Sequence, residues 1–331
     1  MNRYSRQMCL PEVDEAGQTA IRAARVLVVG VGALATPVLQ YLVGAGVGRL
    51  TLVDGDVVSL SNLHRQTLFR EADVGKAKAV VAAQTLRTLN KECAIEAIEV
   101  ALNPSNAMTL AGQNTLVLDC ADSFATSYIL SDTCKALDVP LISASVLGFA
   151  GYVGGFCHTA PSLRAVFPEL PNRAATCATA GVMGPVVGMI GAAQAQMALA
   201  YFIGQKPSPL GQILHFDMQH FRSSGFRFDT APDPTPDLTF IDVADVKEAD
   251  LVIELRNTKE APTLVAANAK RLTVAQFVDR QPTPTANQRA IFACRSGLRA
   301  WQAATHLRSY WDGDINLIAM GDTPSTERNS T

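Results

Sequence analysis

The sequence contains no pair of cysteines separated by two residues, although it has seven cysteines among its 331 residues. An odd and scattered set of thiols does not build a disulfide framework. The first ten residues, MNRYSRQMCL, also lack the apolar core of a signal peptide. We therefore expect reduced thiols and a cytoplasmic location.

An excess of charge of either sign is also missing. The formal net charge is −2, and only 18% of the residues are charged. Without a basic stripe, we expect no nucleic-acid partner. The hydrophobic content of 48% is ample for a large core, which predicts one large and one small domain or two medium ones.

One apolar stretch, residues 180–204, is long enough to span a bilayer. However, Gln194 and Gln196 fall inside it, Pro185 interrupts it, and no basic flank follows it. Its many small residues permit close helix packing. We predict a buried helix, in the core or at a subunit interface, and no membrane partner.

Strands and helices alternate along the first half of the chain. Apolar strands are predicted over residues 25–29 and 49–53, joined by a helix that opens at the glycine-rich turn Gly30–Ala35. Further strands are predicted over residues 94–100, 115–119, 140–145, 151–156 and 212–228. This order favours an α/β fold, doubly wound around a mostly parallel sheet.

The second part begins after Pro232, Pro234 and Pro236, whose alternation is typical of a semi-rigid linker. Two more strands are predicted beyond it, and the second leads through a loop at Cys294 into a helix over residues 300–307. We predict a first domain over residues 1–230, a linker over 231–239, a small α/β domain over 240–322 and a disordered polar tail over 323–331.

Residues suited to phosphate binding follow the second strand. That strand ends in Asp54, where a dinucleotide-binding unit keeps its ribose-binding acid. Asn62, Arg65 and Lys78 come within one short region after it. A dehydrogenase has no evident need for these cations, whereas an enzyme that handles a triphosphate does.

Six blocks in order resemble the MoeB/ThiF adenylyltransferases, relatives of the ubiquitin-activating enzymes: RYSRQ, VVGVGALA, SNLHRQ, VGKAK, LDCAD and TCATAGVMGP. The resemblance runs from about Arg3 to Phe228. It implies that the C-terminal glycine of a carrier attacks the α-phosphate of ATP, with Mg²⁺, to give an acyl-adenylate and pyrophosphate. It also implies three partners: a ubiquitin-like sulfur carrier protein ending in Gly-Gly, a sulfur donor such as a cysteine desulfurase, and a second copy in a homodimer.

The same resemblance implies the site residues. Those expected at the nucleotide are Gly30, Gly32, Ala33, Asp54, Ser61, Asn62, Arg65, Lys78, Asp122 and Ser123. The glycine turn would cradle phosphates with its backbone, Asp54 would bind the ribose hydroxyls, and Asp122 would hold Mg²⁺. Arg6 resembles an arginine contributed across a dimer interface, where its planar fork suits phosphate oxygens. Asp119 is expected to be structural.

Two cysteines are candidate nucleophiles. Cys177 matches a cysteine that in several relatives forms a thioester or acyl disulfide, and the alternative is a buried structural thiol. Cys294 lies in a CxxGxR loop that resembles the active-site loop of rhodanese domains. Arg295, Arg299 and the following helix would favour a thiolate and then a persulfide. The alternative is a domain that keeps the loop without the activity, because residues 254–256 depart from the usual Asp-x-Arg.

Many relatives hold a structural zinc with two CxxC pairs. Here Ser162 and Ala165 stand at the expected positions of the first pair, and residues 223–236 contain no cysteine. Four thiolate ligands cannot be assembled, so we predict no zinc site. Another interaction must then hold the loop over residues 158–176.

Three other functions stay open. A Rossmann oxidoreductase would bind NAD but has no use for Arg65, Lys78 and Asp122 together. A non-catalytic scaffold would bind nucleotide and carrier, and would not depend on Asp122. An enzyme that adenylates a short peptide for antibiotic synthesis shares the core but usually lacks a rhodanese-like tail. For a sulfur carrier, the sequence does not choose among molybdopterin, thiamine and related sulfur pathways.

Overall fold

The computed structural model describes residues 3–170, 181–235 and 237–321. Its larger sheet has eight strands in the order β3-β2-β1-β4-β5-β6-β7-β8. Neighbours from β3 to β5 pair in parallel, and the last three strands add antiparallel pairs. The strands are β1 (Arg25–Val29), β2 (Arg49–Val53), β3 (Ala94–Ile98), β4 (Leu116–Asp119), β5 (Leu141–Leu147), β6 (Ala150–Phe156), β7 (Gln212–Asp217) and β8 (Arg222–Arg227). The predicted α/β fold with a doubly wound, mostly parallel sheet is confirmed.

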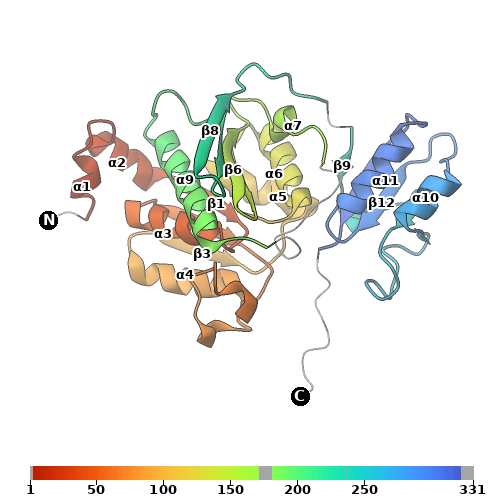
Figure 1. The fold of residues 1–331 in the computed structure, drawn as a ribbon, viewed down its shortest axis with the longest axis horizontal. Helices are drawn as coiled ribbons and strands as arrows, with labels where there is room; N and C mark the ends of the chain where they lie inside the picture. Colours follow the sequence, from red (N-terminus) through yellow and green to blue (C-terminus); the bar gives the residue numbers. More distant parts are fainter. Residues whose placement is uncertain (1–2, 171–180, 236, 322–331) are drawn as a thin grey trace.

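Helices cover both faces of this sheet (Figure 1). One face carries α3 (Ala35–Ala45), α4 (Lys78–Leu89) and α9 (Gly184–Phe202), and the other carries α5 (Pro104–Gly112) and α6 (Phe124–Leu137). The remaining helical segments of this part are α1 (Ser5–Met8), α2 (Asp14–Ala23), α7 (Leu163–Val166) and the 3-10 turns η1 (Leu60–Asn62) and η2 (Glu71–Asp73).

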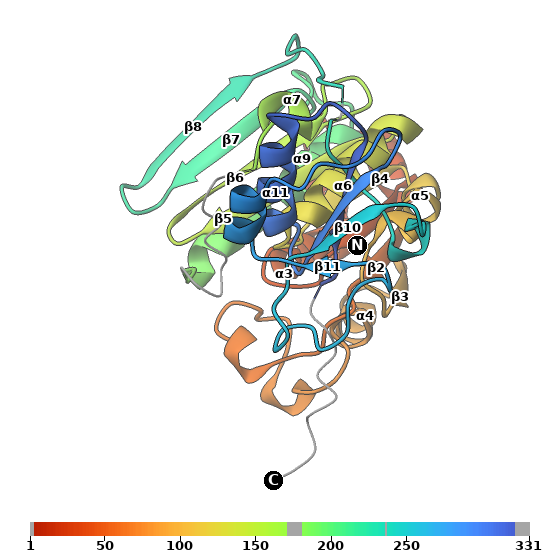
Figure 2. The same cartoon turned by 90° about the vertical axis from the view of Figure 1, so that its right-hand side faces the viewer.

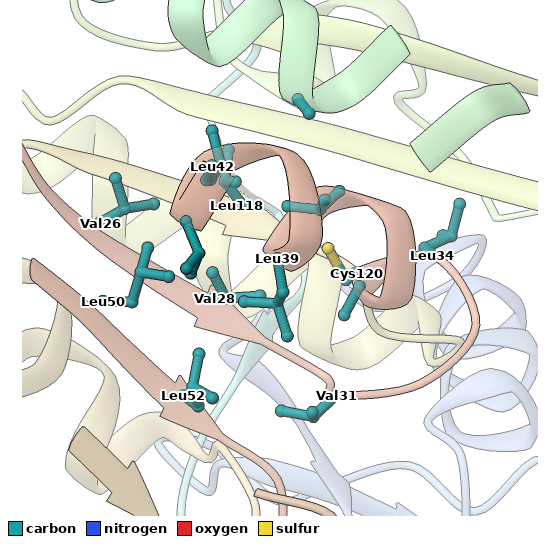
Figure 3. Close-up of a cluster of buried hydrophobic side chains, with 14 of the residues drawn as sticks. Val26, Val28, Val31, Leu34, Leu39, Leu42, Leu50, Leu52, Leu118 and Cys120 are labelled. Carbon is teal, nitrogen blue, oxygen red and sulfur yellow. The ribbon is translucent and has the colours of Figure 1, made fainter. Parts of the chain in front are cut away.

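The central strands β1 and β2 are buried and almost wholly apolar after their first residue, because helices cover both faces of the sheet at its centre. In β1, Val26 and Val28 join the core under α3, whereas Leu27 and Val29 join the core on the α6 side. Figure 3 shows Val28 below α3, with Leu39 reaching down from that helix. This packing fixes α3, and with it the glycine turn that precedes it.

The long apolar helix α9 packs against α3, β5 and β6, which agrees with the predicted core helix. By length and composition it could cross a membrane, yet half of its apolar window is buried in the protein. Gln194 is 0% exposed and donates to the carbonyl oxygens of Asp119 (2.8 Å) and Ile142 (3.0 Å). A glutamine inside this helix thus satisfies backbone groups at the ends of the central strands.

The C-terminal part has a second sheet, parallel throughout, in the order β11-β10-β12-β13-β9 (Figure 1, blue). Its elements are β9 (Thr239–Phe240), η3 (Val243–Asp245), β10 (Leu251–Glu254), β11 (Lys270–Arg271), α10 (Val274–Arg280), β12 (Ala290–Cys294), α11 (Leu298–Arg308) and β13 (Ile315–Ala319). The predictions included β10, β12 and α11. Two-residue strands such as β9 and β11 leave no periodic pattern to detect.

One hydrogen bond joins the two segments where relatives were expected to bind zinc, and an ion pair holds each segment to α6. The Asp233 carboxylate accepts from the backbone N–H of Ser162 (2.7 Å) and pairs with the Lys135 ammonium (2.6 Å). Beside them, Arg164 makes a bidentate pair with Asp132 at 2.6 and 2.7 Å. These bonds hold the described part of the loop. In the described ranges, no group of three His, Cys, Asp or Glu side chains could hold a metal, and the absence of zinc stays a prediction.

Candidate functional site

The predicted nucleotide residues lie where β1 and β4 end. The chain continues from β1 to β2 and β3 on one side, and later returns to β4 and β5 on the other. Such a switch point opens a crevice at the carboxyl ends of the strands. Gly30 has φ +84°, and a Cβ there would lie 2.8 Å from the Cys120 carbonyl oxygen. The two strand ends therefore approach so closely that this position requires glycine.

Asp54 follows β2 and fixes the glycine turn. One carboxylate oxygen accepts from the backbone N–H of Val31, and the other accepts from that of Asp56, both at 2.7 Å. Burial raises the pKa of Asp54, while the Lys78 charge and the two backbone donors act in the opposite direction. Each carboxylate oxygen keeps a further lone pair, with which it can accept from a ligand hydroxyl.

Lys78 is the first residue of α4 and is almost fully buried. Its ammonium pairs with Asp56 at 2.8 Å, and the Asp56 side chain is 67% exposed. The cation is thus held close to Asp54 by a partner that faces solvent. An anionic ligand entering the crevice can replace the solvent-facing Asp56 carboxylate as the partner of this ammonium.

Ser61, Asn62 and Arg65 lie in and after the 3-10 turn η1. The Asn62 carbonyl oxygen accepts from the backbone N–H groups of Arg65 (3.1 Å) and Gln66 (2.9 Å). The Arg65 guanidinium donates to the Ser61 carbonyl oxygen at 3.0 Å. This turn also approaches α9, because a Cβ on Gly184 would lie 2.9 Å from the His64 carbonyl oxygen. The segment is therefore folded against the main body.

Gln66 was not among the predicted site residues. Its side chain is 5% exposed, and its Nε2 lies beside Gly32, 3.4 Å from where a Cβ would be. Within the described residues, its buried Oε1 has no hydrogen-bond partner. Such an atom costs free energy unless a ligand or water donates to it. The sequence signal was present in the SNLHRQ block, but only the packing shows the unpaired acceptor.

Asp119 and Asp122 differ sharply in exposure, although only two residues separate them. Asp122 is exposed at the crevice, just before Ser123 at the start of α6. Asp119 is fully buried and accepts from the Ser143 hydroxyl at 2.7 Å. Burial raises the pKa of Asp119 to about 6. Asp119 is therefore structural, as expected, and Asp122 is available to a ligand.

Arg6 does not reach the crevice of its own chain. It is exposed on α1, whose next residue, Gln7, donates to the Ala45 carbonyl oxygen at 2.9 Å. Ala45 is the last residue of α3, whereas the glycine turn lies at the first. An eleven-residue helix is roughly 16 Å long, so Arg6 lies at the far end of α3 from the phosphate cradle.

Cys177 lies outside the described residues. Cys294 ends β12 and is 0% exposed, and the backbone N–H of Ala300 donates to its sulfur at 3.4 Å. Burial raises the pKa of Cys294, although nearby backbone N–H groups and Arg299 act in the opposite direction. In this arrangement desolvation outweighs the charges around the loop, so it opposes the thiolate that the loop motif was expected to favour.

The arginines near Cys294 are already paired. Arg299 forms an ion pair with Glu260 and donates to the Leu255 carbonyl oxygen at 3.0 Å. Arg256 pairs with the buried Glu254 at 2.7 Å, which gives the departure at residues 254–256 a structural role. Part of the positive charge around the loop is thus neutralised by carboxylates.

The sequence profile of the ThiF family matches residues 4–237, which include the whole nucleotide crevice. The chain belongs to the ThiF family. The five-stranded C-terminal sheet, and Cys294 with it, lies beyond the end of this match.

Two relatives show how far the likeness to this ThiF-family chain extends. The adenylyltransferase and sulfurtransferase MOCS3 of Xenopus laevis is 43% identical over 218 residues, covering 65% of this chain and 48% of that protein. The sulfur carrier protein adenylyltransferase of Thermus thermophilus is 40% identical over 225 residues, covering 66% of this chain and 83% of that protein. The match thus spans about half the length of the Xenopus protein.

The fold is shared with a solved structure of MccB from E. coli. That chain has a TM-score of 0.62 and 20% sequence identity, with 69% of this chain and 70% of the other covered. At this identity the likeness concerns the fold.

Proposed function

We propose that this protein uses ATP to adenylate the C-terminal glycine of a ubiquitin-like sulfur carrier protein, and that it then transfers sulfur toward a thiocarboxylate. The observation that carries the first half is the meeting of Asp54, Lys78 and Asp122 with the glycine turn at one switch point. The names of the relatives support the substrate class, since one relative is a sulfur carrier protein adenylyltransferase and the other an adenylyltransferase and sulfurtransferase.

Adenylation needs positive charge around the α-phosphate. A carboxylate oxygen of the carrier attacks the α-phosphorus, and the bond to the bridging oxygen breaks, so that pyrophosphate leaves with the electron pair. Backbone N–H groups at the start of α3, with Arg65 and Lys78, would stabilise the charge that builds up. Asp122 would hold Mg²⁺, which supplies further neutralisation of the phosphates. The unpaired Oε1 of Gln66 can accept from a hydroxyl or amino group of the nucleotide.

The second half assigns the sulfur chemistry to Cys294. Its thiolate takes sulfane sulfur from a donor such as a cysteine desulfurase persulfide, and the donor leaves as a thiolate. The terminal sulfur then attacks the acyl carbon of the adenylated carrier, the carbon–oxygen bond to AMP breaks, and an acyl disulfide forms. A dithiol reductant cleaves that disulfide, which frees the carrier thiocarboxylate and the Cys294 thiol. The described cysteines are free thiols, which supports a reducing, cytoplasmic setting.

The adenylation site is incomplete in one chain if Arg6 takes part, so we propose a homodimer. A shallow groove of about 700 Å³ between α3 and α9 offers an apolar surface for a second copy, with Tyr41 and Met189 exposed along it. Mixing Arg6→Ala and Asp122→Ala chains tests this. We expect about a quarter of the wild-type activity, because half of the dimers are mixed and each mixed dimer has one complete site. A strictly monomeric protein, or no recovery in mixed dimers, would exclude the shared site.

ATP–pyrophosphate exchange tests the adenylation itself. Purified protein is supplied with Mg²⁺ and each candidate carrier ending in Gly-Gly, beside Asp122→Ala and the exposed, unrelated Asp312→Ala as a matched control. Exchange that depends on one carrier and is lost only in Asp122→Ala supports the proposal and names the sulfur pathway. ATP binding without exchange for any carrier would instead favour a non-catalytic scaffold or a peptide-adenylating enzyme.

A further inference from the structure

Helix α6 connects the two sheets. Its first turn follows Asp122 at the nucleotide crevice, and its Tyr128 packs against Trp301 of α11, with ring centroids 5.3 Å apart. A single apolar cluster extends from β1 in the larger sheet through α6 and α11 to β13 in the smaller one. Figure 2 shows α11 in front of α6, on the side that faces the viewer. The C-terminal part is therefore docked on α6 through a buried surface.

Arg164 stands at the centre of this junction. It is 4% exposed, and its guanidinium lies 4.8 Å from the centre of the Tyr128 ring and 5.7 Å from that of Trp301. It makes the bidentate pair with Asp132 of α6 and also donates to the Leu238 carbonyl oxygen at 3.0 Å. One buried cation thus binds α6, the segment before β9 and an aromatic ring of α11 at the same time.

The segment that joins the two parts is also fastened at both ends. Asp233 is held by Ser162 and Lys135, as described above. Asp237 pairs with Arg308 of α11 at 2.8 Å. A proline-rich linker would permit a range of orientations, but these bonds select one of them.

The docked orientation places the Cys294 loop against the first turn of α6. Gly297, three residues after Cys294, has φ +84°, and a Cβ there would lie 3.1 Å from the Ala125 Cβ and 2.8 Å from the Phe240 ring. Ala125 follows Asp122 by three residues, and the rise along a helix is only about 1.5 Å per residue. The loop is therefore held near the nucleotide end of its own chain, between α6 and β9.

We propose that this α6 junction is a dock that positions Cys294 for sulfur transfer within one chain, with Arg164 and Trp301 as its positioning residues. The inference rests on the proposed function and adds the geometry of transfer. Once the loop around the buried Cys294 has opened and the sulfur is loaded, the Cys294 persulfide attacks the acyl-adenylate formed in the crevice of the same chain, giving the acyl disulfide and AMP as written above. A fixed neighbour raises the effective concentration of the reacting sulfur far above that of a second molecule.

Complementation between two variants tests transfer within one chain. Asp122→Ala lacks adenylation and Cys294→Ser lacks the sulfur nucleophile, so neither makes thiocarboxylate alone. The two chains are co-produced with different tags and purified through both tags, then given thiosulfate, ATP, Mg²⁺, dithiothreitol and the carrier that supports pyrophosphate exchange. We expect thiocarboxylate formation at least about tenfold below wild type.

Each other result has a distinct meaning. Recovery of a quarter or more of the wild-type rate shows that sulfur crosses between chains and overturns the inference. No exchange with any carrier in the wild type overturns the proposed function, and the inference falls with it. Exchange without thiocarboxylate in the wild type overturns the assignment of sulfur transfer to Cys294 and leaves adenylation standing.

A second variant separates docking from folding. Trp301→Ala removes the α11 ring from the junction, and Trp311→Ala is the matched control, because its ring lies against Gly313 of its own part. In Trp301→Ala we expect unchanged pyrophosphate exchange and unchanged loading of Cys294 from thiosulfate, but thiocarboxylate formation reduced tenfold or more. Equal transfer rates in the two variants, with both half-reactions intact, would show that the junction does not position the sulfur.

Discussion

The nucleotide crevice and the Cys294 loop both place reactive groups where parallel strands end, yet they differ in access. At the crevice, Asp122 is exposed and Lys78 is paired with a solvent-facing carboxylate. At the loop, Cys294 is fully buried and Arg299 is paired with Glu260. In both places the strand ends bring the reactive side chains together. The packing around those strand ends decides whether solvent and ligands can reach the side chains. The crevice keeps an exposed carboxylate at Asp122, whereas the sulfur of Cys294 is enclosed and must become exposed before it is loaded.

The sharpest test of this comparison is to inactivate each of the two sites separately. Cys294→Ser should abolish thiocarboxylate formation while pyrophosphate exchange continues, because the sulfur and the adenylating groups belong to different sheets. Cys9→Ser, at an exposed thiol, is the control and should leave both activities intact. Loss of pyrophosphate exchange in Cys294→Ser would mean that adenylation depends on the Cys294 loop.

The next largest effect is expected at Lys78. Lys78→Met removes the buried ammonium beside Asp54 and should lower carrier-dependent exchange by about a hundredfold or more. Lys76→Met is the matched control, since Lys76 is exposed and pairs with Asp73 at 3.1 Å. If the two variants lose activity equally, the Lys78 ammonium does not contribute specifically to adenylation.

Much of the crevice was predictable from sequence, because its parts are local. The glycine turn follows β1 directly and Asp54 follows β2 directly, so strand and turn patterns suffice to place them. The burial of Cys294 was not predictable. The loop after Cys294 packs at Gly297 against α6 and β9, which are distant in sequence, and a loop motif indicates backbone shape rather than the residues that pack against it. The Asp233 and Arg164 pairs were missed for the same reason.

The closed state of Cys294 predicts a steep pH dependence of loading. Because burial raises its pKa, the loop holds a thiol at neutral pH, and the reactive thiolate fraction rises about tenfold per pH unit until that pKa is reached. Loading from thiosulfate, followed by intact mass, should therefore keep rising beyond pH 9. A plateau below pH 8 would show that the thiolate is already formed.

Glu260→Gln should make the Cys294 thiolate easier to form. It removes the carboxylate that neutralises Arg299, so more of the guanidinium charge can stabilise the Cys294 thiolate. We expect loading at neutral pH to increase severalfold, about five- to tenfold, with pyrophosphate exchange unchanged. Glu248→Gln serves as the exposed control. Equal loading of Cys294 in both variants would show that Glu260 does not limit thiolate formation.

The smallest expected effect concerns the contribution of the buried Asp119 to the stability of the fold. The pKa of Asp119 is raised to about 6, so the protonated form stabilises the fold below the unfolded pKa near 4, and this contribution is lost as pH rises through 6. Asp119→Asn stays neutral and should raise the unfolding free energy at pH 8 by roughly 1–3 kcal/mol, with little gain at pH 4. Denaturant unfolding at the two pH values measures this, with Asp312→Asn as the exposed control. A loss of stability at pH 8 would show that the ionised carboxylate is needed.

The most direct test of the whole account is the intact mass of the carrier after incubation with the wild-type protein, ATP, Mg²⁺, thiosulfate and dithiothreitol. We predict that one oxygen of its C-terminal carboxylate is replaced by sulfur, and that omitting ATP or using Cys294→Ser prevents the change. A carrier that supports pyrophosphate exchange but keeps its original mass would contradict the claim that one chain joins an open adenylation crevice to a closed sulfur site.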